Sequence, residues 1–322
     1  MSGSWKLTLP CTRAEAEAIN ADFDLFATLD PPPAIMTRAG DDDQWEVVAY
    51  FEERPSDDSV AALKALTPSS AGVPPHLDRL ADEDWVTLSQ QALEPVSAGR
   101  FYVHTETNRG TPPPGATCFR IEASQAFGTG GHATTAGCLA MLDTLKRHGA
   151  CFANIADVGT GTGLLAFAAL SLWPWARVIA SDIDPASIAV SRENAEINGI
   201  PLGRAPGRLQ LCEAAGVDHA SIRARAPFDL VIANILAGPL IDLAPDFADT
   251  LEPGGALILA GLLDRQTADV VRAYREAGLR LAGRTGDEWP CLRFVRRVER
   301  GYRRPKRARR NEMPATNRFG AW

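Results

Sequence analysis

The stretch Asp157-Val158-Gly159-Thr160-Gly161-Thr162-Gly163 decides the fold, because an apolar segment runs directly into three glycines at alternate positions. Glycine has no Cβ, so the backbone can turn tightly there and approach a ligand, with the N-terminus of the next helix aimed at it. A helix-packing turn explains one such glycine, whereas three after a strand indicate a ligand loop. The spacing is G-x-G-x-G and not the G-x-G-x-x-G of a dinucleotide fold, which argues against a pyrophosphate ligand.

Apolar strands alternate with amphipathic helices around this loop, from about residue 133 onward. The pattern predicts a parallel sheet covered on both faces, with ligands bound at the carboxyl ends of its strands. The expected strands are 153–158, 177–181, 208–212, 229–233, 256–260, 279–285 and 291–297. The expected helices are 133–147, 163–172, 185–198, 238–250 and 264–277, with a turn at Pro253-Gly254-Gly255.

Two aspartates follow the second of these strands, in Ser181-Asp182-Ile183-Asp184-Pro185. A carboxylate at this place, about 20 residues after the glycines, accepts hydrogen bonds from ribose hydroxyls. We assign that role to Asp182, and we assign to Asp184 the capping of the helix that Pro185 begins. A glycine loop with a ribose carboxylate predicts an adenosine-containing ligand, either a nicotinamide dinucleotide or S-adenosylmethionine.

The fourth strand ends in Asn234-Ile235-Leu236, and this ending favours S-adenosylmethionine. Many amino-group methyltransferases carry Asn-Pro-Pro-aromatic here, where the amide oxygen and a backbone carbonyl accept hydrogen bonds from the attacking nitrogen. The chain keeps the asparagine and lacks the prolines and the aromatic residue. An asparagine that merely ends a strand is the alternative interpretation.

The most unusual string lies upstream, at residues 126–135: Ala-Phe-Gly-Thr-Gly-Gly-His-Ala-Thr-Thr. Its three glycines permit a loop folded over a ligand, and its threonine hydroxyls can bond a carboxylate or a helix amide. A glycine-rich turn with threonine caps on the next helix is the alternative.

Taken together, these motifs resemble the ribosomal protein L-eleven (L11) methyltransferase family, the bacterial PrmA proteins. The matching pieces are 83–86, 127–135, 157–163, 182–185, 234–236, 253–255, 261–263 and 287–289. The resemblance implies a small N-terminal domain that recognises the ribosomal protein, a linker, and a class I methyltransferase domain that uses S-adenosylmethionine. It also implies methylation of the N-terminal α-amine and of lysine ε-amines of large-subunit ribosomal protein L-eleven.

Carried over by position, the resemblance implies four cofactor contacts, Thr135, Gly159, Asp182 and Asn234. Asn234, beside the methyl donor, is also the expected catalytic residue. His132 is a hypothesis for a general base, with a role in loop structure as the alternative. Desolvation of the incoming ammonium in an apolar pocket would lower its pKa and could replace a base.

The expected fold class is therefore α/β, a class I (Rossmann-like) methyltransferase domain with a small α+β ferredoxin-like N-terminal domain. We assign residues 1–75 to substrate recognition, 76–125 to a linker with the first strands, 126–299 to the methyltransferase domain and 300–322 to a basic, disordered tail. In the first domain, strands are expected at 5–9 and 45–51, and helices at 12–22 and 56–66; a linking helix is expected at 82–93.

Charge is distributed unevenly along the chain. The net charge is −7, but eight basic residues and one acidic residue follow position 299, which leaves −14 on the first 299 residues. An acidic body attracts a basic partner and is a poor general binder of nucleic acid. The basic tail offers a weak contact to ribosomal RNA, with solvated disorder as the alternative.

Composition and cysteine usage indicate a soluble cytoplasmic protein, which we expect to be a monomer. The six cysteines are scattered without metal-type pairs, so they are expected to be thiols of a reducing compartment and no metal site is expected. No run of about 18 apolar residues and no secretory segment is visible, so no membrane partner is expected.

The family pattern is not matched everywhere, and other functions stay open. Residue 131 is glycine where the family often has a larger residue, segment 200–227 is long and rich in Pro and Arg, and the tail runs past the usual end of the family. The alternatives are a methyltransferase that acts on RNA or a small molecule, and a cofactor-binding protein without catalysis.

Overall fold

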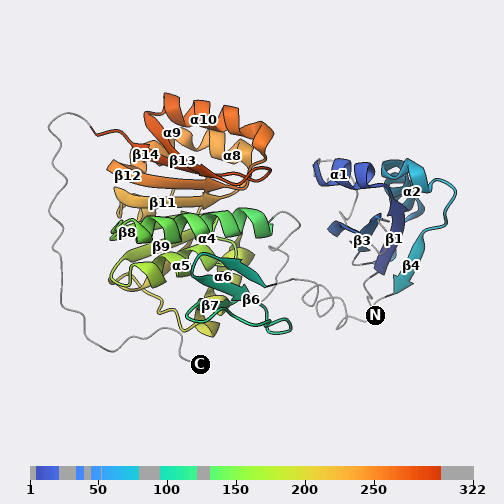
Figure 1. Cartoon of the computed structure of the whole chain (residues 1–322), viewed down its shortest axis with the longest axis horizontal. Coiled ribbons are helices and arrows are strands. Elements are labelled where there is room, and N and C mark those ends of the chain that lie inside the picture. Colours follow the sequence, from blue (N-terminus) through green and yellow to red (C-terminus); the bar gives the residue numbers. More distant parts are fainter. Residues whose placement is uncertain are drawn as a thin grey trace. The chain divides into compact units, whose positions relative to one another are not determined.

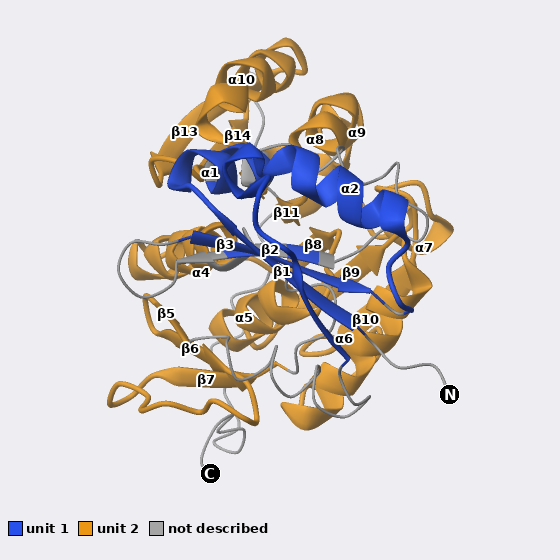
Figure 2. Cartoon of the chain, turned by 90° about the vertical axis from the view of Figure 1, so that its right-hand side faces the viewer, with its two compact units in different colours: residues 1–92 blue, residues 93–322 orange. Residues whose placement is uncertain are grey.

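The computed structural model describes residues 5–21, 34–39, 45–51, 53–79, 95–121 and 131–298 of the chain. Two compact units, residues 1–92 and 93–322, divide it (Figure 2). The linking helix expected at 82–93, the segment 126–130 and the tail 300–322 lie outside the described residues.

The first unit has the β-α-β-β-α-β order expected from the sequence. Its elements are β1 (Trp5–Cys11), α1 (Arg13–Ala21), β2 (Ala34–Ala39), β3 (Trp45–Phe51), α2 (Asp57–Leu66), the 3-10 turn η3 (Pro68–Ser70) and β4 (His76–Arg79). The sheet order is β2-β3-β1-β4, and every neighbouring pair is antiparallel. Each helix therefore connects two strands that enclose a third, which is the ferredoxin-like arrangement.

Strand β4 extends this unit past the boundary expected at residue 75. It pairs with β1 from Trp5 opposite Arg79 to Thr8 opposite His76. The sequence did not indicate this strand because its four residues carry a single apolar side chain, Leu77, which packs against the core of the unit. The small sheet therefore ends at Arg79 and not before residue 76.

Alternation of apolar side chains builds the core of the first unit. Leu7 and Leu9 of β1 and Val47 and Ala49 of β3 are buried together with side chains of both helices. Helix α1 begins with a capping box, in which Thr12 N–H donates to Glu15 Oε2 (2.7 Å) and Glu15 N–H donates to Thr12 Oγ1 (3.2 Å).

The second unit is built on a seven-stranded sheet of order β10-β9-β8-β11-β12-β14-β13 (Figure 1). Its strands are β8 (Asn154–Val158), β9 (Arg177–Asp182), β10 (Leu209–Glu213), β11 (Phe228–Asn234), β12 (Leu251–Ala260), β13 (Leu279–Thr285) and β14 (Cys291–Arg296). All are parallel except β14, which runs antiparallel to both of its neighbours. From β8 the chain adds β9 and β10 on one side, and it then returns to place β11 on the other side of β8. The carboxyl ends of the neighbouring strands β8 and β11 are therefore the switch point of the sheet.

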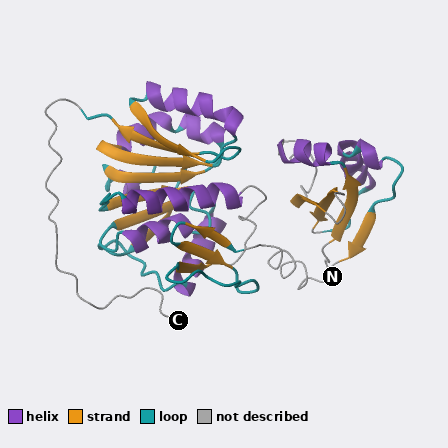
Figure 3. Cartoon of the chain, viewed as in Figure 1, coloured by secondary structure: helices purple, strands orange, loops and turns teal. Residues whose placement is uncertain are grey.

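Helices cover both faces of this sheet, as expected for apolar parallel strands (Figure 3). The helices are α4 (Gly131–Arg147), α5 (Leu164–Leu172), α6 (Pro185–Ile197), α7 (Ala220–Arg223), α8 (Ala237–Asp242), α9 (Ala244–Thr250) and α10 (Thr267–Glu276), with the 3-10 turn η4 (Asp264–Gln266) before α10. Helices α4, α5 and α6 share one buried cluster with the sheet, and α7 to α10 share the other.

A small three-stranded sheet lies on the α4 side. Its strands are β5 (Val96–Ala98), β6 (Phe101–His104) and β7 (Thr117–Arg120), and the last two agree with the strands that the sequence predicts at 101–104 and 116–121. Phe101 and Phe119 bury their rings in the same cluster as α4 and α5. Asn198, at the end of α6, ties this sheet down by donating from Nδ2 to the Arg120 carbonyl at 2.7 Å.

Two details of the sequence prediction are wrong. The single helix expected over 238–250 is two helices that meet at Leu243, because Pro245 lacks an N–H and its ring does not fit a helix interior. The turn expected at Pro253-Gly254-Gly255 lies inside β12 as an irregularity, since Phe228 pairs with Leu251 and Leu230 pairs with Ala256.

Candidate active site

The four residues expected to contact the cofactor gather at the carboxyl ends of three neighbouring strands. Gly159 follows β8 directly, Asp182 is the last residue of β9, and Asn234 is the last residue of β11. Thr135 lies in the first turns of α4 and meets Asn234. Strand β8 pairs with both β9 and β11, so these side chains surround the switch point of the sheet.

The glycine loop leaves β8 in a backbone conformation with positive φ, which residues with a side chain rarely adopt. Gly159 has φ 72°, and a Cβ placed on it would lie 2.2 Å from Cγ2 of Ile235. Its N–H donates to the Ser181 carbonyl at 2.8 Å, which fastens the loop to the end of β9. At Gly161 a Cβ would meet no described atom within 4 Å, so the loop is open on that side.

Asp182 is oriented by the backbone before any ligand binds. Its Oδ2 accepts from Gly161 N–H at 2.8 Å and its Oδ1 accepts from Asp184 N–H at 3.1 Å. The carboxylate therefore joins the glycine loop to the tip of β9. Each oxygen still has a second lone pair with which it can accept a hydroxyl.

Asn234 and Thr135 form a hydrogen bond from β11 to α4. The Asn234 Nδ2 donates to Thr135 Oγ1 at 3.3 Å, although the two residues lie 99 positions apart in the chain. With its nitrogen directed to Thr135, the carboxamide presents its oxygen as the acceptor for another group. An amide oxygen at this place can hold an amine N–H.

Helix α6 supplies two loop-holding residues that sequence reasoning missed. Ser191 Oγ donates to the Gly161 carbonyl at 2.7 Å, and Asn194 Nδ2 donates to the Thr162 carbonyl at 3.1 Å. Both side chains are buried, 0% and 1% exposed. Their spacing of three places them on one helix face, but nothing in the sequence indicates that this face meets the glycine loop.

Asp157, the first residue of the loop motif, is buried with one oxygen unsatisfied. Its Oδ2 accepts from Thr160 Oγ1 at 2.7 Å and from Ala166 N–H at 3.1 Å. Within the described residues its Oδ1 has no hydrogen-bond partner. Burial, with a smaller contribution from the charge of Asp182, raises the pKa of Asp157 to about 7 against the opposing hydrogen bonds.

Gly261, the residue after β12, packs against the backbone of Ile235, the residue after Asn234. Gly261 has φ 89°, and a Cβ on it would lie 2.3 Å from the carbonyl oxygen of Ile235. No side chain fits in that space, so glycine at this position lets the backbone of Ile235 lie where Asn234 requires it.

Asp184, just after β9, and Asp229, in β11, have structural roles. Asp184 caps α6 as expected, accepting from Ala186 N–H at 2.9 Å and Ser187 N–H at 3.2 Å, and these bonds lower its pKa. Asp229 is buried at the start of β11, where it accepts from the N–H groups of Ala153 and Asn154, far along the strand from Asn234. The side chain of His132 lies outside the described ones.

Exposed apolar side chains stand beside the site. Ile183 follows Asp182 and is 70% exposed, and Leu236 follows Ile235 and is 73% exposed. Both side chains follow strand tips that carry proposed contact residues. Among the described residues, no helix combines the length and apolar character needed to span a bilayer, and no cluster of His, Cys, Asp or Glu suits a metal ion.

This sheet order, with a glycine loop and acidic and amide residues at successive strand tips, defines a class I S-adenosylmethionine-dependent methyltransferase fold. A family model described as ribosomal protein L11 methyltransferase (PrmA) matches residues 12–297. The chain belongs to the ribosomal protein L11 methyltransferase (PrmA) family.

Individual relatives agree with that assignment. The chain is 38% identical over 278 residues to a ribosomal protein L11 methyltransferase of Brucella suis, covering 85% of this chain and 93% of the relative. It is 41% identical over 251 residues to one of Agrobacterium fabrum, covering 76% and 83%. A crystal structure of ribosomal protein L11 methylase from Lactobacillus delbrueckii subsp. bulgaricus is 28% identical, with a TM-score of 0.52 over 64% of this chain and 98% of that one.

Proposed function

We propose that the protein transfers methyl groups from S-adenosylmethionine to amino groups of ribosomal protein L11, at its N-terminal α-amine and at lysine ε-amines. The observation that carries the proposal is the hydrogen bond between Asn234 and Thr135, which directs an amide oxygen beside the glycine loop. Family membership supports the substrate, since the relatives are named for L11.

The residues around the loop fit S-adenosylmethionine. The open side of Gly161 leaves room for the ligand, and Asp182 has lone pairs free for the two ribose hydroxyls. The unsatisfied Oδ1 of Asp157 suits the cationic ammonium of the methionine part, because a buried acceptor without a partner costs about 1–3 kcal/mol. Thr135 and Gly159 complete the proposed set of contacts.

S-adenosylmethionine supplies a methyl group on a positively charged sulfur, which is a good leaving group. The task left to the chain is to align an uncharged amine with that methyl group. Asn234 does this by accepting an amine N–H on its carboxamide oxygen, which points the nitrogen lone pair in a fixed direction. Thr135 acts as a positioning residue, because its hydroxyl keeps the carboxamide from turning over.

The amine must lose a proton before it attacks. A lysine amine has an ordinary pKa of about 10.4 and is charged at neutral pH. Ile183 and Leu236 would be covered by a bound substrate and would remove water from the ammonium, which lowers its pKa. The proton then leaves to water, so the proposal needs no dedicated base, and His132 stays a hypothesis for that role.

The remaining parts of the chain are given roles outside the chemistry. We assign substrate recognition to the first unit, because it has its own core and no residue of the candidate site belongs to it. The basic tail 300–322 is assigned a weak contact with ribosomal RNA, on the basis of its eight basic residues. We propose that the protein acts as a cytoplasmic monomer.

Incubation with S-adenosylmethionine labelled in the methyl group tests the function. Purified L11, a mixture of ribosomal proteins and ribosomal RNA are offered separately. We expect label in purified L11 and, within the mixture, in the L11 component only. An Asn234→Ala variant should lose this labelling while its affinity for S-adenosylmethionine stays within a few-fold of that of the unchanged protein. Label in RNA would support the alternative methyltransferase, and cofactor binding without label in any acceptor would support a non-catalytic protein.

A further inference from the structure

Three exposed arginines and an exposed tryptophan gather at the amino ends of β9 and β10, at the other end of the strands from the candidate active site. Trp175 is 52% exposed in the loop before β9, and Arg177 is the first residue of that strand. Arg204 and Arg208 are exposed in the loop that leads into β10. We call these four residues the basic surface.

Backbone hydrogen bonds hold the two loops of the basic surface together. Gly207 N–H donates to the Ala176 carbonyl at 2.8 Å, directly beside Trp175. Val178 N–H donates to the Arg208 carbonyl at 3.3 Å. The backbone therefore holds Trp175, Arg177 and Arg208 close to one another, and Arg204 lies in the same loop as Arg208.

No carboxylate of the described chain neutralises this surface. Arg177, Arg204 and Arg208 form no ion pair among the described residues. Segments 173–177 and 199–208, which contribute the two loops, contain no acidic residue. Guanidinium groups without a carboxylate partner in the described chain give this surface a local positive charge, and that local charge is complementary to a polyanion even though the whole chain is acidic.

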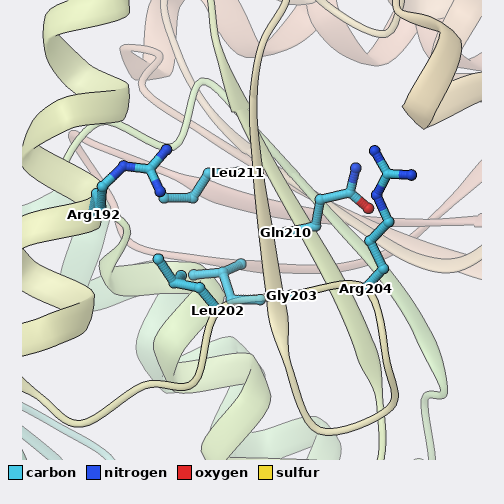
Figure 4. Close-up of a pocket in the computed structure, with 7 residues that line it drawn as sticks. Arg192, Leu202, Gly203, Arg204, Gln210 and Leu211 are labelled. Atoms are coloured by element: carbon cyan, nitrogen blue, oxygen red, sulfur yellow. The ribbon is translucent and has the colours of Figure 1, made fainter.

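A shallow pocket adjoins the basic surface (Figure 4). It has a volume of about 230 Å³, with Leu202 and Leu211 in its lining and the side chains of Arg192 and Arg204 on opposite sides. Sites for small-molecule ligands usually enclose about 300–1,000 Å³. The pocket therefore suits one flat group of a larger ligand better than a free metabolite.

We propose that the basic surface and its pocket bind single-stranded RNA. Arginine forks pair with phosphate oxygens in a bidentate manner, and an exposed indole offers a face on which any base stacks. An acidic peptide would satisfy the arginines but would leave the ring of Trp175 without a stacking partner. A membrane surface is a poorer match, because it is bound by amphipathic helices and this surface consists of loops.

Binding of a labelled single-stranded RNA of about 12 nucleotides to the full chain, measured over a series of salt concentrations, tests the proposal. The double variant Arg204→Ala/Arg208→Ala should bind more weakly, and its salt slope should fall by about 0.7 for each phosphate that is no longer neutralised. Trp175→Ala should weaken binding roughly tenfold with an unchanged slope, as expected for one stacked base. The tail is present in every variant, so the differences report on the basic surface.

The matched control is Arg275→Ala/Arg280→Ala, which removes two exposed arginines from α10 and β13 with the same change in charge. It should leave both affinity and salt slope close to those of the unchanged protein. Equal RNA binding by the two double variants would overturn the proposal. Polyglutamate is tested as a second ligand. If Arg204→Ala/Arg208→Ala lowers binding of polyglutamate and leaves RNA binding unchanged, the proposal is overturned in favour of an acidic peptide. Methylation of free L11 should be the same in all variants, which separates this inference from the proposed function.

Discussion

Two backbone N–H donors orient the carboxylate of Asp182, from Gly161 at 2.8 Å and from Asp184 at 3.1 Å, and we propose that this carboxylate accepts the ribose hydroxyls. Asp182→Ala should weaken binding of S-adenosylmethionine by about 1.5–3 kcal/mol, the range for a hydrogen bond to a charged group. Isothermal titration calorimetry measures this loss. Asp184→Ala is the matched control, since it should lower the stability of α6 and leave cofactor affinity nearly unchanged.

The buried Asp157 should make stability depend on pH. Burial raises its pKa in the folded protein from 3.8 to about 7. Its contribution to folding is therefore fully present below pH 3.8 and is lost as the pH rises through about 7. The free energy of unfolding attributable to this group should fall by up to about 1.4 kcal/mol per pH unit between these values.

Urea unfolding of the ligand-free protein and of Asp157→Asn, repeated from pH 5 to pH 8, isolates that contribution. Asparagine cannot ionise, so the variant should gain stability relative to the unchanged protein as the pH rises. Parallel stability profiles for the two proteins would show that Asp157 does not titrate in this range.

Residues that end strands were predictable, and residues that support them were not. Asp182, Asp184 and Asn234 follow apolar strands, and the geometry of parallel sheets alone brings such positions to one edge. Ser191 and Asn194 lie inside α6, where a polar residue usually faces water. Only the folded loop reveals that their hydrogen bonds run to the carbonyls of Gly161 and Thr162.

Helix α6 holds the glycine loop of the proposed cofactor site by hydrogen bonds from Ser191 and Asn194. Ser191→Ala removes the donor to the Gly161 carbonyl and leaves that acceptor without its partner. The free energy of unfolding should fall by about 1–3 kcal/mol, and cofactor affinity should fall with it because binding must then order the loop. Glu193→Ala, an exposed change on the same helix, is the control and should alter neither quantity.

The predicted boundaries of two elements are wrong, and in both cases proline or glycine misled the prediction. The periodicity of residues 238–250 fits one helix, but the chain restarts at Ala244 because Pro245 is tolerated only in a first turn. Pro253-Gly254-Gly255 has the composition of a turn, yet pairing with β11 continues on either side of it. Local composition predicts bending, whereas hydrogen bonding between strands decides whether the strand continues.

At the scale of the whole molecule, recognition and chemistry should be separable. Each unit has its own buried cluster, and the candidate site draws only on the second. Removing residues 1–92 should therefore abolish methylation of L11 while the remainder still binds S-adenosylmethionine. Calorimetry and label transfer measured on the same preparation check both halves of this prediction. A remainder that methylates L11 at the normal rate would contradict a docking role for the first unit.

The family was visible in the sequence because motifs such as 157–163, 182–185 and 234–236 follow strands in a fixed order. The extent of the first unit was less visible. Strand β4 forms because it pairs with β1, whose residues lie some seventy positions earlier in the chain. The sequence of His76–Arg79 alone does not indicate that pairing.

The contact between Gly261 and Ile235 limits how this enzyme can evolve. A single methyl group at position 261 would lie 2.3 Å from the Ile235 carbonyl oxygen and would have to displace the residue next to Asn234. Nearly every mutation at position 261 would therefore also disturb Asn234, whose amide we propose to align the amine. Selection for a new amine acceptor should consequently leave position 261 unchanged. Leu236, two residues after that amide and 73% exposed, has no such restriction, so changes in acceptor preference should accumulate there while residue 261 stays glycine.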